Sequence, residues 1–138
     1  MSAPFVLTGI DHVVLLVGDM KRATNFYTEV IGCTVDNDLP QYGMRQLRAG
    51  SALIDLVDIG SAEGAWAKPQ VPGGRNVDHV ALGLGPADPE AVRRHLAAHG
   101  IEIVEEGDRV GALGETLSFY VADPDGNQIE LSFPSQRA

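Results

Sequence analysis

Hydrophobic and polar positions alternate in two similar stretches of the chain, GIDHVVLLV at 9–17 and NVDHVALGL at 76–84. Alternation with a period of two predicts a β-strand in each stretch, with successive side chains on opposite faces. In the first stretch, His12 and Val14 share one face and Leu15 lies on the other. Each strand therefore combines an aliphatic face suited to packing with a face that carries a histidine.

A helix is predicted after each of these strands. In 19–32, apolar residues at helical spacing lie between Asp19, a suitable N-cap, and Gly32, a suitable stop. In 88–100, Pro89 takes the first helical position, where its missing N–H costs nothing. Both segments have the length and punctuation of ordinary helices in globular proteins.

Three further strands are predicted after each helix, so that each half of the chain reads βαβββ. In the second half, the turn Asp-Pro-Asp-Gly at 123–126 joins the last two predicted strands. We therefore predict an α+β fold, in which two tandem βαβββ modules form a cupped mixed β-sheet with the helices on its outer face. The predicted strands are 33–39, 44–49 and 52–58 in the first half, and 101–106, 116–122 and 127–133 in the second.

The chain is long enough for one globular domain, which we expect to cover 1–138. Its 138 residues are 44% hydrophobic, enough to build a buried core. The modules are expected at about 7–60 and 77–133. The Gly/Ala/Pro-rich segment 61–76 between them has no sustained period and is expected to be the linker.

Charge and apolar content argue against several classes of partner. The formal net charge is −9, and no basic stripe gathers the few Lys and Arg side chains, so we expect neither nucleic acid nor membrane as a partner. The longest apolar run, 13–17, is far too short to span a bilayer. The start of the chain does not resemble a signal peptide, and the one cysteine, Cys33, is expected to be a buried thiol. We therefore expect a cytoplasmic protein.

Each module also supplies an acid on its last strand. Glu130 lies on the polar face of the strand 127–133, and Asp55 takes the matching place in 52–58. A single strand histidine is most often an ordinary hydrogen-bonded residue. Two histidines and two acids at matching positions of a repeat instead favour a site for a divalent metal such as Fe, Mn, Ni, Co or Zn. Two His and one carboxylate leave coordination positions open to substrate, which is typical of a catalytic site.

These features together resemble the vicinal oxygen chelate superfamily of glyoxalases, bleomycin resistance proteins and extradiol dioxygenases. The resemblance runs from Leu7 to Phe133 and includes His12 in GIDHVVL, His79 in NVDHVAL and Glu130 in FYVADPDGNQIEL. It implies that His12, His79 and Glu130 are the metal ligands. It also implies a homodimer with metal sites shared between chains, His12 coming from one chain and His79 and Glu130 from the other.

Asp55 matches the place where glyoxalase I carries a fourth ligand, a glutamate. Aspartate is one methylene shorter, which leaves four roles open: direct ligation, binding through water, a catalytic base, or a polar pocket residue. Glu130 and Asp55 are the candidate catalytic residues, because a carboxylate can move between metal and proton.

Three further residues are candidates for substrate binding. Tyr120 and Ser118 share a face of the strand 116–122 and resemble positions that contact substrate in fosfomycin thiol transferases, although ordinary sheet packing with a solvated hydroxyl is the commoner explanation of such residues. Arg109 lies in the Gly-rich segment 105–116, expected to be a loop. This loop is either a mobile lid that presents a cation or a flexible connection with a solvated arginine.

The resemblance implies a metal-dependent glyoxalase-like or dioxygenase-like enzyme, that is, a lyase, isomerase or dioxygenase. Its small-molecule substrate would chelate the metal through adjacent oxygens. The alternatives are a metal-free, drug-sequestering binding protein of the bleomycin-resistance type and a fosfomycin-modifying enzyme. The binding proteins have generally lost the ligand set and need a broad aromatic groove, whereas only 6% of residues here are aromatic. The substrate and the metal stay open, because one scaffold supports many chemistries.

Overall fold

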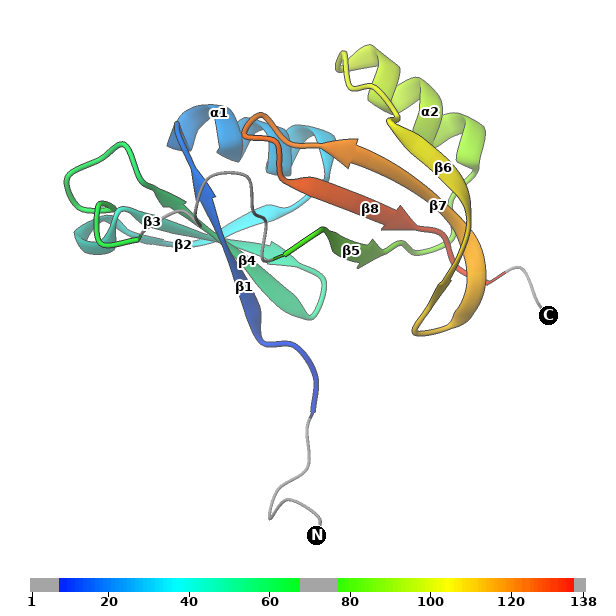
Figure 1. Cartoon of the computed structure of the whole chain (residues 1–138), viewed down its shortest axis with the longest axis horizontal. Helices are drawn as coiled ribbons and strands as arrows, with labels where there is room; N and C mark the ends of the chain where they lie inside the picture. The colour runs from blue at the N-terminus through cyan, green and yellow to red at the C-terminus, as the bar shows by residue number, and fades with distance from the viewer. Residues whose placement is uncertain (1–7, 68–76, 136–138) are drawn as a thin grey trace, which may run out of the picture.

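The computed structural model describes residues 8–67 and 77–135, and its strands form two four-stranded sheets (Figure 1). The N-terminal sheet has the order β1-β4-β3-β2 and the C-terminal sheet the order β5-β8-β7-β6. The first contains β1 (His12–Val17), β4 (Ala52–Asp58), β3 (Met44–Ala49) and β2 (Thr34–Leu39). The second contains β5 (Val80–Gly83), β8 (Gln128–Ser132), β7 (Gly114–Ala122) and β6 (Glu105–Gly111).

The pairing within the two sheets is the same, which confirms the predicted repeat. In each sheet the first strand of the module is parallel to the last, and the remaining pairs are antiparallel. Val14 pairs with Asp55 in one sheet, and Ala81 pairs with Glu130 in the other. The predicted α+β fold of two βαβββ modules is therefore confirmed, with the strands divided between two mixed sheets that do not close into a barrel.

The helices lie on one side of the sheets, as predicted (Figure 1). They are α1 (Met20–Asn25), which continues into the π-helix η1 (Phe26–Val30), and α2 (Pro89–Ala98). A short 3-10 helix, η2 (Pro40–Tyr42), connects β2 to β3. The Asp19 side chain caps α1 by accepting a hydrogen bond from the backbone N–H of Arg22. Within the described residues, no helix is both long and apolar enough to cross a membrane.

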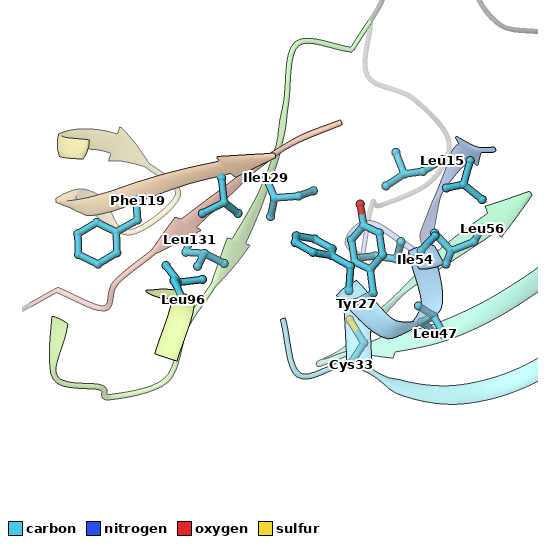
Figure 2. Packing of buried hydrophobic residues seen from close by; sticks show 14 of the residues in the cluster. Leu15, Tyr27, Cys33, Leu47, Ile54, Leu56, Leu96, Phe119, Ile129 and Leu131 are labelled. Atoms are coloured by element: carbon cyan, nitrogen blue, oxygen red, sulfur yellow. The ribbon is translucent and has the colours of Figure 1, made fainter. Parts of the chain in front are cut away.

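The core lies between the helices and the aliphatic faces of both sheets. Leu15 and Val17 of β1 are buried, as the alternation predicts, and Cys33 is buried as expected. Side chains from both modules belong to one hydrophobic cluster. Figure 2 shows members from the C-terminal module, Leu96, Phe119, Ile129 and Leu131, and from the N-terminal module, Tyr27, Leu47, Ile54 and Leu56.

Polar contacts also join the two modules, and we call them the inter-module latch. The buried Tyr27 hydroxyl donates a hydrogen bond to Oδ2 of Asp123, at 2.7 Å. Oδ1 of Asp125 accepts from the backbone N–H of Gly18 at 2.8 Å and from Nη2 of Arg22 at 3.1 Å. The Asp-Pro-Asp-Gly turn after β7 therefore holds the end of β1 and the first helix of the other module.

The structure corrects the prediction for 101–116. The strand predicted at 101–106 begins only at residue 105, and the expected loop 105–116 is instead the β6–β7 hairpin. The alternation in 101–104 reflects core packing, because Ile101 and Ile103 lie against the hydrophobic cluster. The glycines suggested a loop, but seven consecutive residue pairs with the long strand β7 outweigh that local preference. Of the predicted linker, only 61–67 lies within the described residues.

Candidate metal centre

His79 and Glu130 form a pair that we call the C-terminal half-site. His79 comes directly before β5, and the parallel pairing of Ala81 with Glu130 places both side chains on the face away from the core. Nε2 of His79 lies 3.0 Å from Oε1 of Glu130. Two ligand atoms at adjacent positions of one ion, each about 2.1 Å from it, are separated by roughly 3 Å. The spacing of these two atoms therefore fits two ligands of one metal.

Neighbouring side chains hold Glu130 in its ionised form. The Ser118 hydroxyl donates a hydrogen bond to Oε2 of Glu130, at 2.7 Å. Burial raises the pKa of Glu130, but hydrogen bonds from Ser118 and Tyr120 and the charge of His79 outweigh it, so the pKa is lowered overall. The Tyr120 ring also meets the His79 ring edge to face, with centroids 5.4 Å apart. Glu130 is thus a pre-oriented carboxylate whose Oε1 faces the histidine.

His12 and Asp55 form the matching N-terminal half-site, but its geometry is looser. Nε2 of His12 lies 4.0 Å from Oδ2 of Asp55. The same Oδ2 accepts a hydrogen bond from Nε2 of Gln46, at 3.2 Å, because Gln46 is the cross-strand neighbour of Asp55 on β3. Asp55 is only 2% exposed, and its Oδ1 has no hydrogen-bond partner among the described residues. A buried carboxylate oxygen without a partner is costly unless a ligand or a proton meets it.

The aspartate that precedes each histidine is also part of the site. Nδ1 of His12 lies 2.7 Å from Oδ2 of Asp11, and Nδ1 of His79 lies 2.7 Å from Oδ2 of Asp78. The hydrogen bond with Asp11, followed by the charge of Asp55, raises the pKa of His12. The sequence-based reasoning assigned no role to Asp11, Asp78 or Gln46. The repeated Asp-His doublet was the visible signal for the aspartates, and the alternation along β3 was the signal for Gln46.

The two half-sites remain separate within one chain. Among the residues that the structure describes, no group of three or more His, Cys, Asp or Glu side chains lies close enough to hold a metal ion. Within one chain, His12 therefore does not join His79 and Glu130 in a three-ligand group. Both half-sites nevertheless offer imidazole and carboxylate donors, which fit a divalent first-row metal.

The candidate substrate-binding residues lie around the C-terminal half-site. Ser118 is completely buried and its hydroxyl is used by Glu130, which fits a supporting role for this side chain. Arg109, on β6, places its guanidinium 5.6 Å from the centre of the Tyr120 ring and 3.4 Å from a carboxylate oxygen of Glu105. Arg109 therefore sits at the edge of the half-site on a regular strand. Its contact with substrate, like that of Tyr120 and Ser118, stays a prediction.

Comparison with known proteins adds three relatives and a family. The family described as the Glyoxalase/Bleomycin resistance protein/Dioxygenase superfamily matches residues 9–131. The chain is 37% identical over 126 residues to the glyoxalase domain-containing protein RDO1 of Mycosarcoma maydis, covering 89% of this chain but only 66% of that protein. It is 31% identical over 128 residues to lactoylglutathione lyase of Salmonella typhimurium, covering 87% of this chain and 88% of the relative. An integron cassette protein of V. cholerae, VCH_CASS1, superposes with a TM-score of 0.72 at 32% identity, covering 95% and 98% of the two chains.

Proposed function

Because the chain belongs to the Glyoxalase/Bleomycin resistance protein/Dioxygenase superfamily, we propose that it is a metal-dependent lyase or isomerase acting on a small molecule. Its substrate would carry oxygens on adjacent carbons. The observation that carries this proposal is the ionised Glu130 with its Oε1 3.0 Å from Nε2 of His79. A relative 31% identical to this chain is named lactoylglutathione lyase. The lactoyl group has a hydroxyl and a carbonyl oxygen on neighbouring carbons, and two such oxygens can chelate a metal at this site.

The proposed metal site is completed by a second copy of the chain. His12 of one chain and His79 and Glu130 of the other supply three ligands for Fe, Mn, Ni, Co or Zn. This pairing is supported by the described residues, in which each half-site by itself lacks a third ligand. In a two-fold symmetric homodimer this combination of His12 with the other chain's half-site occurs twice, so two equal sites form. When bound, the metal supplies Lewis acidity, which stabilises negative charge on a substrate oxygen.

We assign proton transfer to Asp55. Its Oδ2 is held by Gln46, and its Oδ1 is the buried oxygen without a partner among the described residues. Glu130, the other candidate acid, is engaged by His79, Ser118 and Tyr120 and is better suited to ligation. Asp55 would take the proton from the substrate carbon next to the bound oxygen and return it to the neighbouring carbon, while the hydroxyl proton would pass between the two substrate oxygens, so that hydroxyl and carbonyl exchange places.

The first test is the metal content of anaerobically purified protein. Wild type is expected to carry about one divalent ion per chain, the ratio of a three-ligand site, and His79→Ala to lose it. Asp55→Ala is expected to retain the metal. Iron or manganese would favour the dioxygenase alternative, because those metals support redox chemistry. Absence of any metal after reconstitution would contradict the proposal and favour a drug-sequestering binding protein.

The second test follows the proton. Loaded protein is incubated with lactoylglutathione in D₂O, and proton NMR follows the hydrogen on the hydroxyl-bearing carbon. Deuterium should replace this hydrogen with wild type but not with Asp55→Asn, which keeps the shape of the side chain and cannot act as a base. Exchange by both proteins would contradict the role of Asp55. Exchange by neither, in metal-loaded protein, would contradict lactoylglutathione as a substrate.

A further inference from the structure

We propose that Asp11 and Asp78 are positioning residues, which hold the rings of His12 and His79 so that Nε2 faces the metal. The inference rests on the proposed metal site and extends it to two exposed side chains outside the ligand set. It explains why the chain contains the Asp-His doublet twice rather than histidine alone.

The hydrogen-bond geometry determines which ring nitrogen is available. In both modules Nδ1 lies 2.7 Å from the aspartate that precedes the histidine. An ionised carboxylate only accepts hydrogen bonds, so a neutral His12, whose Nε2 lies 4.0 Å from Asp55, carries its hydrogen on Nδ1. The His79 ring lies within 3.0 Å of a carboxylate at both nitrogens, and a metal bound at Nε2 would leave its hydrogen on Nδ1. The lone pair of the neutral ring is then on Nε2. In each module Nε2 is also the nitrogen that faces the acid of the last strand, Asp55 or Glu130.

Burial does not explain these two aspartates. The Asp11 side chain is 91% exposed and that of Asp78 is 77% exposed, so neither packs in the core. Each directly precedes a histidine at the start of its module, and the two modules reproduce the same contact at the same distance. A carboxylate behind a metal-binding imidazole fixes the ring and makes it a better donor, and its removal typically weakens metal binding 10- to 100-fold.

The surroundings of the two histidines predict unequal effects. The His79 ring also contacts the ring of Tyr120, which restrains it from a second side. His12 has no aromatic ring contact among the described residues, and its side chain is more exposed, 45% against 33%. Loss of Asp11 should therefore weaken metal binding more than loss of Asp78.

The test measures Zn²⁺ affinity by calorimetry for Asp11→Ala, Asp78→Ala and the corresponding asparagine variants. The alanine variants should bind Zn²⁺ about 10- to 100-fold more weakly. The asparagine variants should lose less, because the amide oxygen still accepts a hydrogen bond from Nδ1. Glu102→Ala is the matched control: it removes one exposed negative charge, and among the described residues Glu102 forms no ion pair with either histidine. Its affinity should match that of wild type.

A second readout is independent of metal. ¹⁵N NMR of the metal-free protein, at a pH where the rings are neutral, should show the Nδ1–H tautomer of His12 in wild type and in Glu102→Ala. Asp11→Ala should shift His12 to the Nε2–H tautomer. Unchanged tautomers, or wild-type Zn²⁺ affinity in both alanine variants, would overturn the inference and leave the proposed function standing. Failure of wild type itself to bind Zn²⁺ or any other divalent ion would overturn the proposed function instead, and the metal-directed role of the aspartates with it.

Discussion

The two half-sites have the same backbone register but different side-chain geometry. Asp55 and Glu130 are paired with residues two positions after His12 and His79, respectively. Glu130 nevertheless comes within 3.0 Å of its histidine, whereas Asp55 stays 4.0 Å away. The Asp55 side chain is one methylene shorter, which accounts for the longer distance to His12. Its Oδ2 also accepts a hydrogen bond from Gln46 on the neighbouring strand β3.

This difference distinguishes the placement of the residues, which the fold determines, from their contacts, which the individual side chains determine. The repeated βαβββ unit places a histidine and an acid on the same face in each module. The two acids differ in length and in hydrogen-bond donor: Ser118 donates to Glu130, the proposed ligand, and Gln46 donates to the buried carboxylate of Asp55. The repeat thus supplies matching places, and the proposed roles of the two acids follow from their different lengths and donors.

The largest expected effect comes from shortening Glu130. Glu130→Asp makes the C-terminal half-site resemble the N-terminal one, so its carboxylate should fall short of the position beside His79. We expect Zn²⁺ affinity to fall at least about 100-fold, or roughly 2.7 kcal/mol, measured by calorimetry. Wild-type affinity in this variant would show that side-chain length does not distinguish the two half-sites.

The latch that holds the two modules together should give the next largest effect. Tyr27→Phe removes the buried hydrogen bond to Asp123 and should lower the free energy of unfolding by about 2 kcal/mol in urea titrations. Tyr42→Phe, at an exposed tyrosine, is the control and should change little.

The latch also predicts a pH dependence. Burial, followed by the charge of Asp123 and the hydrogen bond to it, raises the pKa of Tyr27 far above its ordinary value. The stabilisation is therefore complete below about pH 10, where the unfolded tyrosine begins to ionise, and declines as the pH rises further. The stability difference between wild type and Tyr27→Phe should shrink above that pH. A difference that grows instead would contradict this assignment.

Removing the support of Glu130 should have a smaller effect than shortening it. Ser118→Ala deletes the hydroxyl that donates to Oε2 and should weaken Zn²⁺ binding about tenfold. Thr116→Val is the matched control, because the Thr116 hydroxyl bonds to Ser132 rather than to Glu130. Equal losses in the two variants would indicate a general effect on the strand β7.

The smallest expected effect is a gain. Asp55→Glu restores the missing methylene and should tighten Zn²⁺ binding by about threefold, since part of the gain is offset by crowding of a buried position. Asp55→Asn should leave Zn²⁺ affinity near that of wild type. Strong loss of metal in Asp55→Asn would show instead that Asp55 is a ligand.

Most of the fold and the halves of the site could be predicted from the sequence. Strict alternation places His12 and Glu130 on polar faces, and comparison of the two halves finds Asp55. The hairpin at 105–116 was missed because glycine content signals a loop, whereas strand pairing with β7 is a non-local interaction. The separation of the two half-sites was also beyond alternation, which assigns each side chain to a face but does not determine which two faces meet.

The most direct test of the central proposal, a metal site shared between two chains, mixes two defective variants. His12→Ala and His79→Ala are unfolded together, refolded and assayed for bound Zn²⁺, with each variant alone as the control. A shared site predicts that mixed dimers regain one intact site, because one chain supplies His12 and the other supplies His79 and Glu130. With random pairing, the mixture should bind about a quarter as much metal as wild type. No metal in the mixture, with wild type binding fully after the same treatment, would contradict the shared site.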